Sequence, residues 1–196
     1  NQMVTFIVAG HETVASALTW ALALLAAHPV EQELLHAELS AIVRDEPMTI
    51  EDYARLTRTR AVFDEALRLY PPAWLITRKA LAHGELGGRV VPAGSLVIMS
   101  PWLLHRHPSL WRTPEEFRPS RFIDEVIDRS AFLPFGAGPR MCIGRDFAYV
   151  EGVLMLARLA AAFEVSFSDG STMPAIDPLV TIRPAGGLRL RVTRRG

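Results

Sequence analysis

The segment of the chain best suited to chemistry surrounds a lone cysteine. Cys142 is the only cysteine among 196 residues, which excludes an internal disulfide and a cysteine-rich zinc site. The run before it contains Phe135, Gly136, Gly138 and Arg140, and a helix is predicted after it, from about Gly144 to Phe163. The glycines permit backbone turns that are closed to other residues. Gly144 also lets the helix begin close to whatever covers the cysteine.

The position of Cys142 just before a helix favours a thiolate. A helix N-terminus offers unpaired N–H groups and a partial positive charge, and both stabilise the ionised sulfur. Backbone amides after the cysteine could hydrogen-bond the sulfur and tune its electron donation. Arg140 is placed to bind an anionic group, such as a carboxylate, on whatever the sulfur holds. The alternative is that Cys142 is a small buried hydrophobe, the commonest state of a lone cysteine.

A second candidate is the run Ala9-Gly10-His11-Glu12-Thr13, inside an apolar stretch from Met3 to Ala27. Glycine inside a helix costs about 1 kcal/mol relative to alanine, so it needs a reason. The hydroxyl of Thr13 can bond the carbonyl of Ala9, which loosens the helix and opens a small polar pocket. The alternative is a helix that tolerates a glycine and exposes a glutamate.

A third candidate is an acid and a base one helical turn apart, Glu65 and Arg68. As an exposed pair they would add only a few tenths of a kcal/mol, roughly, to stability. That surface pair is the alternative to any structural role for them.

The cysteine segment resembles the haem-binding motif of the cytochromes P450, Phe-x-x-Gly-x-Arg-x-Cys-x-Gly, at every fixed position. The resemblance implies haem b (iron protoporphyrin IX) as cofactor, with Cys142 as the proximal ligand of the iron. It also implies that Phe135 packs beside the sulfur, that Arg140 binds a propionate, and that Gly136 and Gly144 lie against the cofactor. An arginine at the place of Arg78 often meets the second propionate in this family; a surface arginine is the alternative.

The other two segments resemble motifs of the same family. Residues 9–13 match its oxygen-side helix, which implies that Ala9 and Gly10 flank bound dioxygen and that Glu12 and Thr13 deliver protons. Glu65 and Arg68 match a buried ion pair that Arg121, in the run Phe117–Phe122, would complete. Such a set is a scaffold rather than a catalyst. His11 is interpreted as structural.

Residues expected to line the substrate pocket are inferred from the family's substrate-contacting segments, and their apolar character suits an apolar substrate. Each could equally be plain core. They are Phe6, Ile7, Ala73, Trp74, Leu75, Ile76, Leu179 and Val180.

The resemblance implies an oxidoreductase, a haem-thiolate monooxygenase that inserts one atom of dioxygen into an apolar molecule. Electrons would come from outside the chain, from NAD(P)H by way of a ferredoxin or flavin reductase, because no flavin or ferredoxin motif is present. One alternative is an enzyme of the same fold that uses peroxide or rearranges hydroperoxides, and another is a truncated, non-catalytic haem-binding relative. The resemblance covers only about the last half of such a haem domain, so we expect residues 1–196 to be a partial domain and inactive alone.

The rest of the chain predicts a mainly helical α+β fold. Helices are predicted over 3–27, 30–43, 50–55 and 60–70, strands over 75–80, 89–91 and 96–99, and a packed aromatic loop over 105–141. The end is predicted as a hairpin of residues 179–183 and 188–192 around a Pro-Ala-Gly-Gly turn. Acidic and basic residues balance at 21 each, which suggests neither a nucleic-acid nor an anionic-membrane partner. His11, Glu12, Thr13 and Ser16 interrupt the first apolar stretch and argue against a membrane segment. The Ala-, Arg- and Gly-rich composition favours a cytoplasmic bacterial protein.

Overall fold

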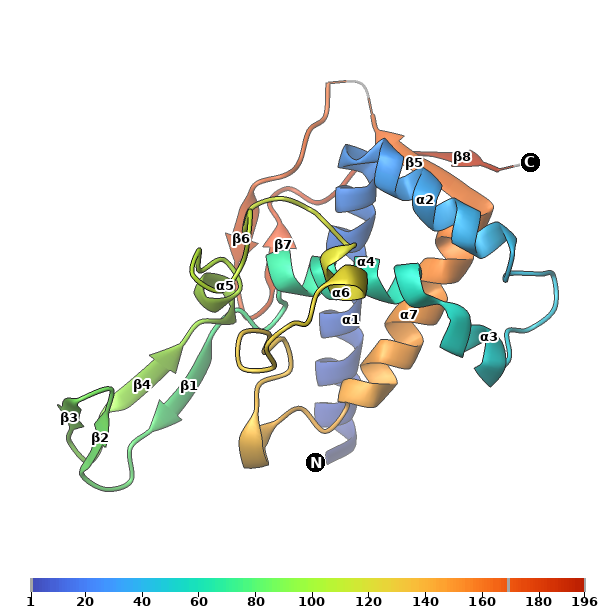
Figure 1. Cartoon of the computed structure of the whole chain (residues 1–196). Helices are drawn as coiled ribbons and strands as arrows, with labels where there is room; N and C mark the ends of the chain where they lie inside the picture. The colour runs from blue at the N-terminus through green and yellow to red at the C-terminus, as the bar shows by residue number, and fades with distance from the viewer. Residues whose placement is uncertain (1, 169, 196) are drawn as a thin grey trace.

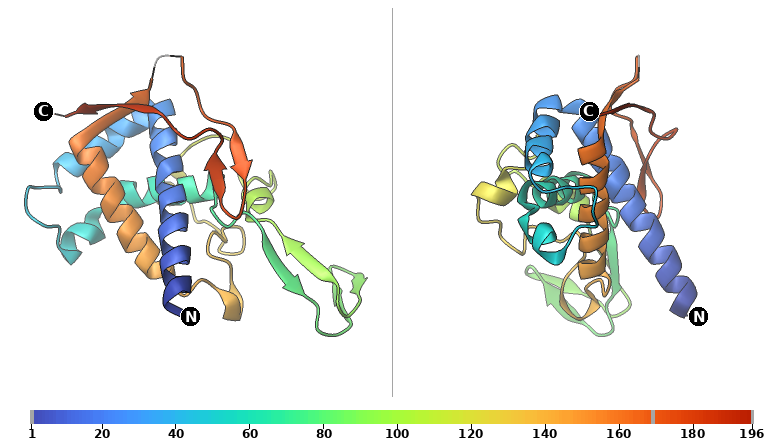
Figure 2. Two further views of the ribbon diagram at one scale, coloured as in Figure 1. Left: turned by 180° about the vertical axis from the view of Figure 1, so that it is seen from behind. Right: turned by 90° about the vertical axis from the view of Figure 1, so that its right-hand side faces the viewer.

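Helix α1 (Gln2–Ala27) runs through the middle of a helical body, where α4 and α7 cross it (Figures 1 and 2). The computed structural model describes residues 2–168 and 170–195, with side chains from residue 7 onward apart from that of residue 8. From Val14 on, α1 forms much of the core, and Trp20, Ala21 and Leu25 are at most 1% exposed. The helix ends before Pro29, as predicted, because proline restricts the residue before it to non-helical conformations.

The remaining long helices pack around α1. They are α2 (Pro29–Ser40), α4 (Thr57–Leu69) and α7 (Arg145–Ala162), with the short α3 (Ile50–Arg55) before α4. Helix α4 is buried along most of its length. It approaches α7 so closely at Gly152 that a Cβ there would lie 2.3 Å from the Phe63 ring. The predicted helices are therefore present, with ends displaced by up to three residues.

The long aromatic loop is ordered by its own side chains. Short helices lie in it or beside it: α5 (Pro101–Leu104), α6 (Arg121–Asp124) and the 3-10 turn η1 (Gly138–Arg140). The Phe122 and Phe132 rings lie 4.9 Å apart, and Trp111 lies 6.2 and 6.3 Å from them. The prediction of a packed loop is confirmed, although the short helices within it were not predicted.

The strands form antiparallel pairs. Strand β1 (Ile76–Lys79) pairs with β4 (Leu96–Met99), and β2 (Gly84–Leu86) pairs with β3 (Arg89–Val91). These two pairs form an arm that projects from the helical body (Figures 1 and 2). This layout confirms a mainly helical α+β fold. The strands expected near 75–80, 89–91 and 96–99 are present, whereas β2 was not predicted.

The predicted terminal hairpin is wrong. Strand β7 (Ile182–Pro184) pairs with β6 (Ile176–Pro178), and β8 (Leu190–Arg194) pairs with β5 (Phe163–Phe167). Gly186 and Gly187 take φ of 73° and 83°, so the turn predicted between paired strands instead carries the chain from one sheet to another. Leu179 and Val180, expected in a strand, lie in the turn of the β6–β7 hairpin. Sequence shows that strands exist, but the partner of each depends on tertiary packing.

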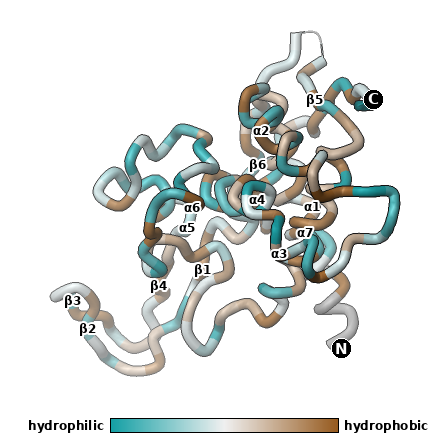
Figure 3. Tube along the Cα trace, turned by 45° about the vertical axis from the view of Figure 1, so that its right-hand side comes forward, coloured by the Kyte–Doolittle hydropathy of each residue, from teal (hydrophilic) through white to brown (hydrophobic). Residues whose placement is uncertain are grey.

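Hydrophobic residues gather where α1, α4 and α7 meet, as the colouring of Figure 3 shows. Among the described residues, no single helix combines the length and hydropathy needed to cross a bilayer. Residues 9–27 and α2 meet those criteria only jointly, as a pair bent by 112°.

Candidate haem-thiolate site

The loop before α7 presents the Cys142 side chain to the outside. Gly136 and Gly138 both take φ of 70°, a left-handed conformation that bends the loop. The Cys142 N–H donates to the carbonyl oxygen of Phe135, 2.9 Å away, and this hydrogen bond closes the loop. Gly144 caps α7, and a Cβ there would lie 3.9 Å from the Cys142 sulfur. The sulfur is therefore exposed beside the first turn of an 18-residue helix.

The surface next to the sulfur is apolar. Ile143 and Phe147 are 87% and 73% exposed, and Met141 is 43% exposed. Exposed large apolar side chains clustered in one place mark a surface that binds something.

Two arginines near this surface have no acidic partner among the described residues. Arg140 is exposed, and the structure gives its side chain no hydrogen bond within the described part of the chain. Arg78 donates only to the carbonyl oxygen of its neighbour Thr77, at 2.8 Å. Strand β1 adjoins the cysteine loop, because a Cβ on Gly136 would lie 3.6 Å from Cδ1 of Ile76. The structure thus brings β1, which carries Ile76 and Arg78, beside the loop that carries Cys142 and Arg140.

A brace behind the loop was missed by sequence reasoning. The Phe135 ring lies 5.2 Å from the Tyr149 ring, and the Tyr149 hydroxyl donates to Asp64 at 2.6 Å. Burial raises the pKa of Asp64 to about 6, against the lowering effects of the Tyr149 hydrogen bond and the Arg60 charge. Burial also raises the pKa of Tyr149. No sequence signal joins two residues 85 positions apart; only the fold does so.

The oxygen-side motif on α1 has the predicted internal hydrogen bond. The Thr13 hydroxyl donates to the Ala9 carbonyl at 2.7 Å and lies 3.5 Å from the Gly10 carbonyl. Ala9 and Gly10 are exposed, and a Cβ on Gly10 would meet nothing within 4 Å. No described neighbour therefore requires glycine at position 10, whereas a ligand approaching the helix backbone would.

Glu12 contacts the β6–β7 hairpin and the residue just before β7. Its carboxylate accepts from the Thr181 hydroxyl at 2.6 Å and forms an ion pair with Arg183, both next to or within β7. These two hydrogen bonds, that of Thr181 first, lower the pKa of Glu12. Within the described residues Glu12 and Thr13 share no hydrogen bond, and their joint role in proton delivery stays a prediction.

The β6–β7 hairpin is fixed to α1 along one stripe. Ser16 Oγ and Trp20 Nε1 donate to the Ile182 carbonyl at 2.7 and 3.2 Å, one and two turns beyond Glu12. On the outer side, Trp74 Nε1 donates to the Leu179 carbonyl at 2.9 Å. These contacts fix the position of the hairpin turn along α1.

Of the expected pocket residues, the structure brings Trp74 and Leu179 together and leaves several exposed. Ile7 and Val180 are 67% and 91% exposed, so neither is core in this chain. Ala73, Leu75 and Leu179 are also exposed, and Ile76 is half-buried. The Phe6 side chain lies outside the described residues. Their joint role as a substrate pocket remains a prediction.

The predicted ion pairs of Glu65 are present and fully buried. Arg68 Nε donates to Glu65 Oε2 at 2.7 Å, and Arg121 Nε donates to Oε1 at 3.0 Å. The three side chains are 0% exposed. Arg68 also donates to the carbonyls of His105, Pro114 and Glu116, which fastens the long loop to α4. We call Glu65, Arg68 and Arg121 the ion-pair lock.

His105, left unassigned from sequence, extends the lock. Its Nδ1 lies 3.2 Å from the Arg68 carbonyl, and its Nε2 accepts from the Leu133 N–H at 2.9 Å. Burial is the main cause that lowers the pKa of His105 to about 4. The neutral ring therefore joins α4 to the segment that leads into the cysteine loop.

Comparison with known proteins gives one consistent result. The family model for cytochrome P450 matches residues 1–190. The chain is 43% identical to cyclooctat-9-en-7-ol 5-monooxygenase and 44% identical to cyclooctatin synthase, both from Streptomyces melanosporofaciens. These alignments cover 88% and 84% of this chain, but 38% and 37% of the relatives. Pentalenene oxygenase from Streptomyces avermitilis is 35% identical over 100% of this chain and 44% of its own length.

The chain belongs to the cytochrome P450 family, and it spans well under half the length of the curated relatives it matches. The family implies a haem cofactor, and the residues present fit that group. The structure offers an exposed thiol at a helix N-terminus, an apolar surface beside it, and two arginines without acidic partners among the described residues. A flat apolar macrocycle with two carboxylates and an open axial position needs those three things.

Proposed function

We propose that this chain supplies the thiolate and proton-handling side of a haem monooxygenase that acts on an apolar molecule. The observation that carries the proposal is the exposed Cys142 sulfur just before α7, in a loop that Gly136 and Gly138 bend. A buried structural cysteine would not need this exposure. The activity is proposed for the complete haem domain to which residues 1–196 contribute.

Each residue has a distinct proposed task. Cys142 ligates the iron, and Arg140 and Arg78 neutralise the two propionates. Bound haem supplies the redox chemistry that activates dioxygen, with the thiolate donating electron density. Gly10 leaves room beside α1, since no described atom lies within 4 Å of its Cβ direction. The Thr13 hydroxyl donates to the Ala9 carbonyl, which leaves its oxygen lone pairs free to accept a hydrogen bond from a water and so to position a proton donor.

The substrate proposed is largely hydrocarbon. Two relatives are named for oxygenating cyclooctat-9-en-7-ol and pentalenene. Ile7, Leu179 and Val180, among the residues expected to line the pocket, are exposed apolar side chains. The electrons are proposed to come from NAD(P)H through a ferredoxin or flavin reductase.

The test is a carbon-monoxide difference spectrum of the reduced full-length protein. A thiolate-type Soret band is expected. A band typical of histidine ligation, or failure to take up haem, would end the proposal.

One observation favours a second candidate, a peroxide-using enzyme of the same fold. Glu12 is engaged by Arg183 and Thr181 rather than by Thr13, so the proton route needed for dioxygen is not assembled as a direct pair. The two candidates differ in Thr13→Ala. A monooxygenase should lose coupling of NAD(P)H consumption to product, roughly tenfold or more, whereas peroxide-driven turnover should be unchanged.

A further inference from the structure

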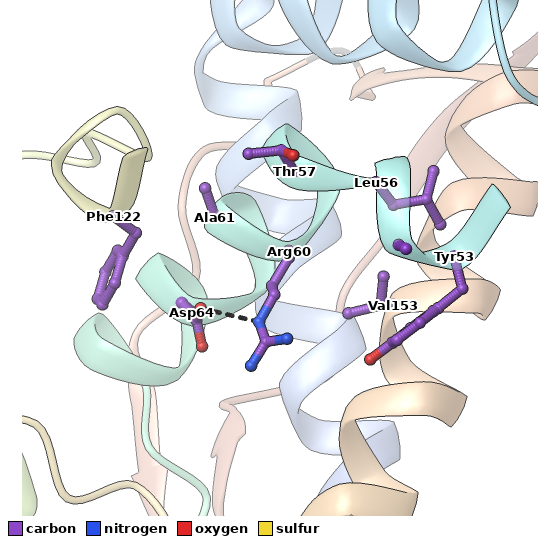
Figure 4. A pocket seen from close by; sticks show the side chains of 9 residues that line it. Tyr53, Leu56, Thr57, Arg60, Ala61, Asp64, Phe122 and Val153 are labelled. Atoms are coloured by element: carbon purple, nitrogen blue, oxygen red, sulfur yellow. Dashed lines mark ion pairs between the residues drawn. The ribbon is translucent and has the colours of Figure 1, made fainter. Parts of the chain in front are cut away.

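Two cavities open beside the helix that carries the ion-pair lock, and they share a carboxyl group. One, of about 190 Å³, lies between α3, α4, α6 and α7 and is lined by Tyr53, Arg60, Asp64 and Phe122 among others (Figure 4). The other, of about 680 Å³, is lined by Asp64, Tyr149, Phe135 and the glycines of the cysteine loop. Asp64, on α4, thus lines both cavities, the larger of which borders the thiolate loop.

A continuous set of contacts leads from Asp64 to Cys142. Asp64 Oδ1 accepts from the Tyr149 hydroxyl at 2.6 Å, and the Tyr149 ring packs on the Phe135 ring at 5.2 Å. The Phe135 carbonyl then accepts the Cys142 N–H at 2.9 Å. Each step joins neighbouring groups, and Asp64, Tyr149 and Phe135 are buried or half-buried, so displacement of Tyr149 is transmitted to the loop.

Tyr149 is fixed on its other sides as well. The Arg60 guanidinium lies 4.8 Å from its ring centroid, and the Phe63 ring meets it edge-on at 6.0 Å. Arg60 Nε also lies 3.9 Å from Asp64 Oδ2, the pair drawn in Figure 4. The Arg60 side chain is 55% exposed, so solvent screens this ion pair, and the Tyr149 hydroxyl is the stronger partner of Asp64.

We propose that Asp64 and Tyr149 are positioning residues for the thiolate loop, and that proton binding at Asp64 shifts the reduction potential of the haem iron. The inference rests on the proposed function, because it needs haem bound at Cys142. A negative charge behind the ligand loop disfavours the added electron, and a proton on Asp64 removes that charge. One proton from solvent enters Asp64, and one electron enters from the external donor.

The charged groups around Asp64 set the pH range. The pKa of Asp64 is raised to about 6, mainly by burial and also by the Glu65 charge, while the Tyr149 hydrogen bond and the Arg60 charge act to lower it. Arg145 and Asp146 complete the charges on the α7 side, since Arg145 acts on Tyr149 and Asp146 interacts with Arg60. Asp64 therefore changes charge between about pH 5 and 7, where both cavities give solvent access to it.

The experiment measures the midpoint potential of the full-length haem protein from pH 5 to 8. The wild-type potential should fall as pH rises through about 6. In Asp64→Asn the midpoint potential should stay, from pH 5 to 8, at the value that the wild type shows below pH 6, with no inflection. In Tyr149→Phe the ring stays and the hydroxyl is lost, so the inflection should move to higher pH, because that hydrogen bond stabilises the carboxylate.

Tyr53→Phe is the matched control. It removes a phenol hydroxyl from the lining of the same cavity as Asp64, and the structure gives that hydroxyl no partner within the described residues. Its potential curve should match the wild type. An inflection that persists in Asp64→Asn, or stays in place in Tyr149→Phe, overturns the inference.

The carbon-monoxide spectrum separates the two possible failures. If the wild type lacks a thiolate band, the proposed function fails and the inference with it. If every variant keeps the thiolate band and the midpoint potentials do not change with these substitutions, only the inference fails.

Discussion

The ion-pair lock and the surface around Cys142 use charged and polar groups in opposite ways. In the lock every side chain is 0% exposed, and each carboxylate oxygen has partners within the chain. Around Cys142 the sulfur is exposed and Arg140 lacks a partner among the described residues, while Ile143 and Phe147 face outward. Charges buried in protein must be paired internally, whereas groups that bind a ligand must be left available.

The difference separates stability from chemistry. The chain completes the lock by itself, so changes there should alter unfolding. The proposed haem-facing surface, defined by Cys142, Ile143, Phe147, Arg140 and Arg78, would be completed by a ligand, so changes there should alter binding and turnover. Substitutions in each region test whether stability and haem binding depend on different residues.

Cys142→Ser should give the largest effect, complete loss of the thiolate-type spectrum and of detectable turnover in the full-length protein. Serine replaces the sulfur with an oxygen that is a poor ligand for haem iron and does not ionise near neutral pH. Because the side chain is exposed, the free energy of unfolding without haem should change by less than about 0.5 kcal/mol. Absorbance and chemical denaturation measure the two quantities. A serine variant that kept the spectrum would contradict the ligand assignment.

Glu65→Gln should instead lower the free energy of unfolding by roughly 3–5 kcal/mol, because it leaves Arg68 and Arg121 buried without a counter-charge. Urea denaturation measures the loss. Glu115→Gln is the matched control, since Glu115 is 72% exposed in its pair with Arg106 and should contribute less than about 1 kcal/mol. Equal effects of the two substitutions would show that the lock does not act as a buried set.

His105 should make the lock sensitive to acid. Its pKa falls from 6.5 to about 4 in the folded chain, so the unfolded chain binds the extra proton between those values. The free energy of unfolding should therefore decrease as pH drops from about 6.5 toward 4, by at most about 3 kcal/mol. Denaturation across this range, with His105→Gln as comparison, measures the slope. A slope unchanged in that variant would assign the acid sensitivity to other groups.

Contacts within sequence motifs were predicted better than the pairing of strands. The lock residues and the Thr13–Ala9 hydrogen bond follow from local spacing or a family motif, and both contacts are present. The pairing of β7 with β6, and of β8 with β5, was missed because strand partners are chosen by packing over long separations.

Partners of single polar groups were the hardest to predict. Asp64 and Tyr149 carry no motif, and the motif that contains Glu12 did not predict its contacts with Thr181 and Arg183. Motifs report residue type and spacing on one element. The direction of a side chain depends on the element packed against it, here β7 for Glu12 and α7 for Asp64.

Arg183→Gln should give the smallest effect and tests the contact that departs from the family motif. Thr181 and Arg183 lower the pKa of Glu12, so losing the Arg183 partner should raise it. If Glu12 takes part in proton delivery, the acid limb of the pH–rate profile should move to higher pH, with turnover at neutral pH changed by only a few-fold, roughly, because the pair is exposed. Arg183→Lys keeps the positive charge and should restore the wild-type profile. If the acid limb stays in place in Arg183→Gln, Glu12 handles no protons and only fastens the β6–β7 hairpin to α1. Its role would then be structural, like that of the ion-pair lock.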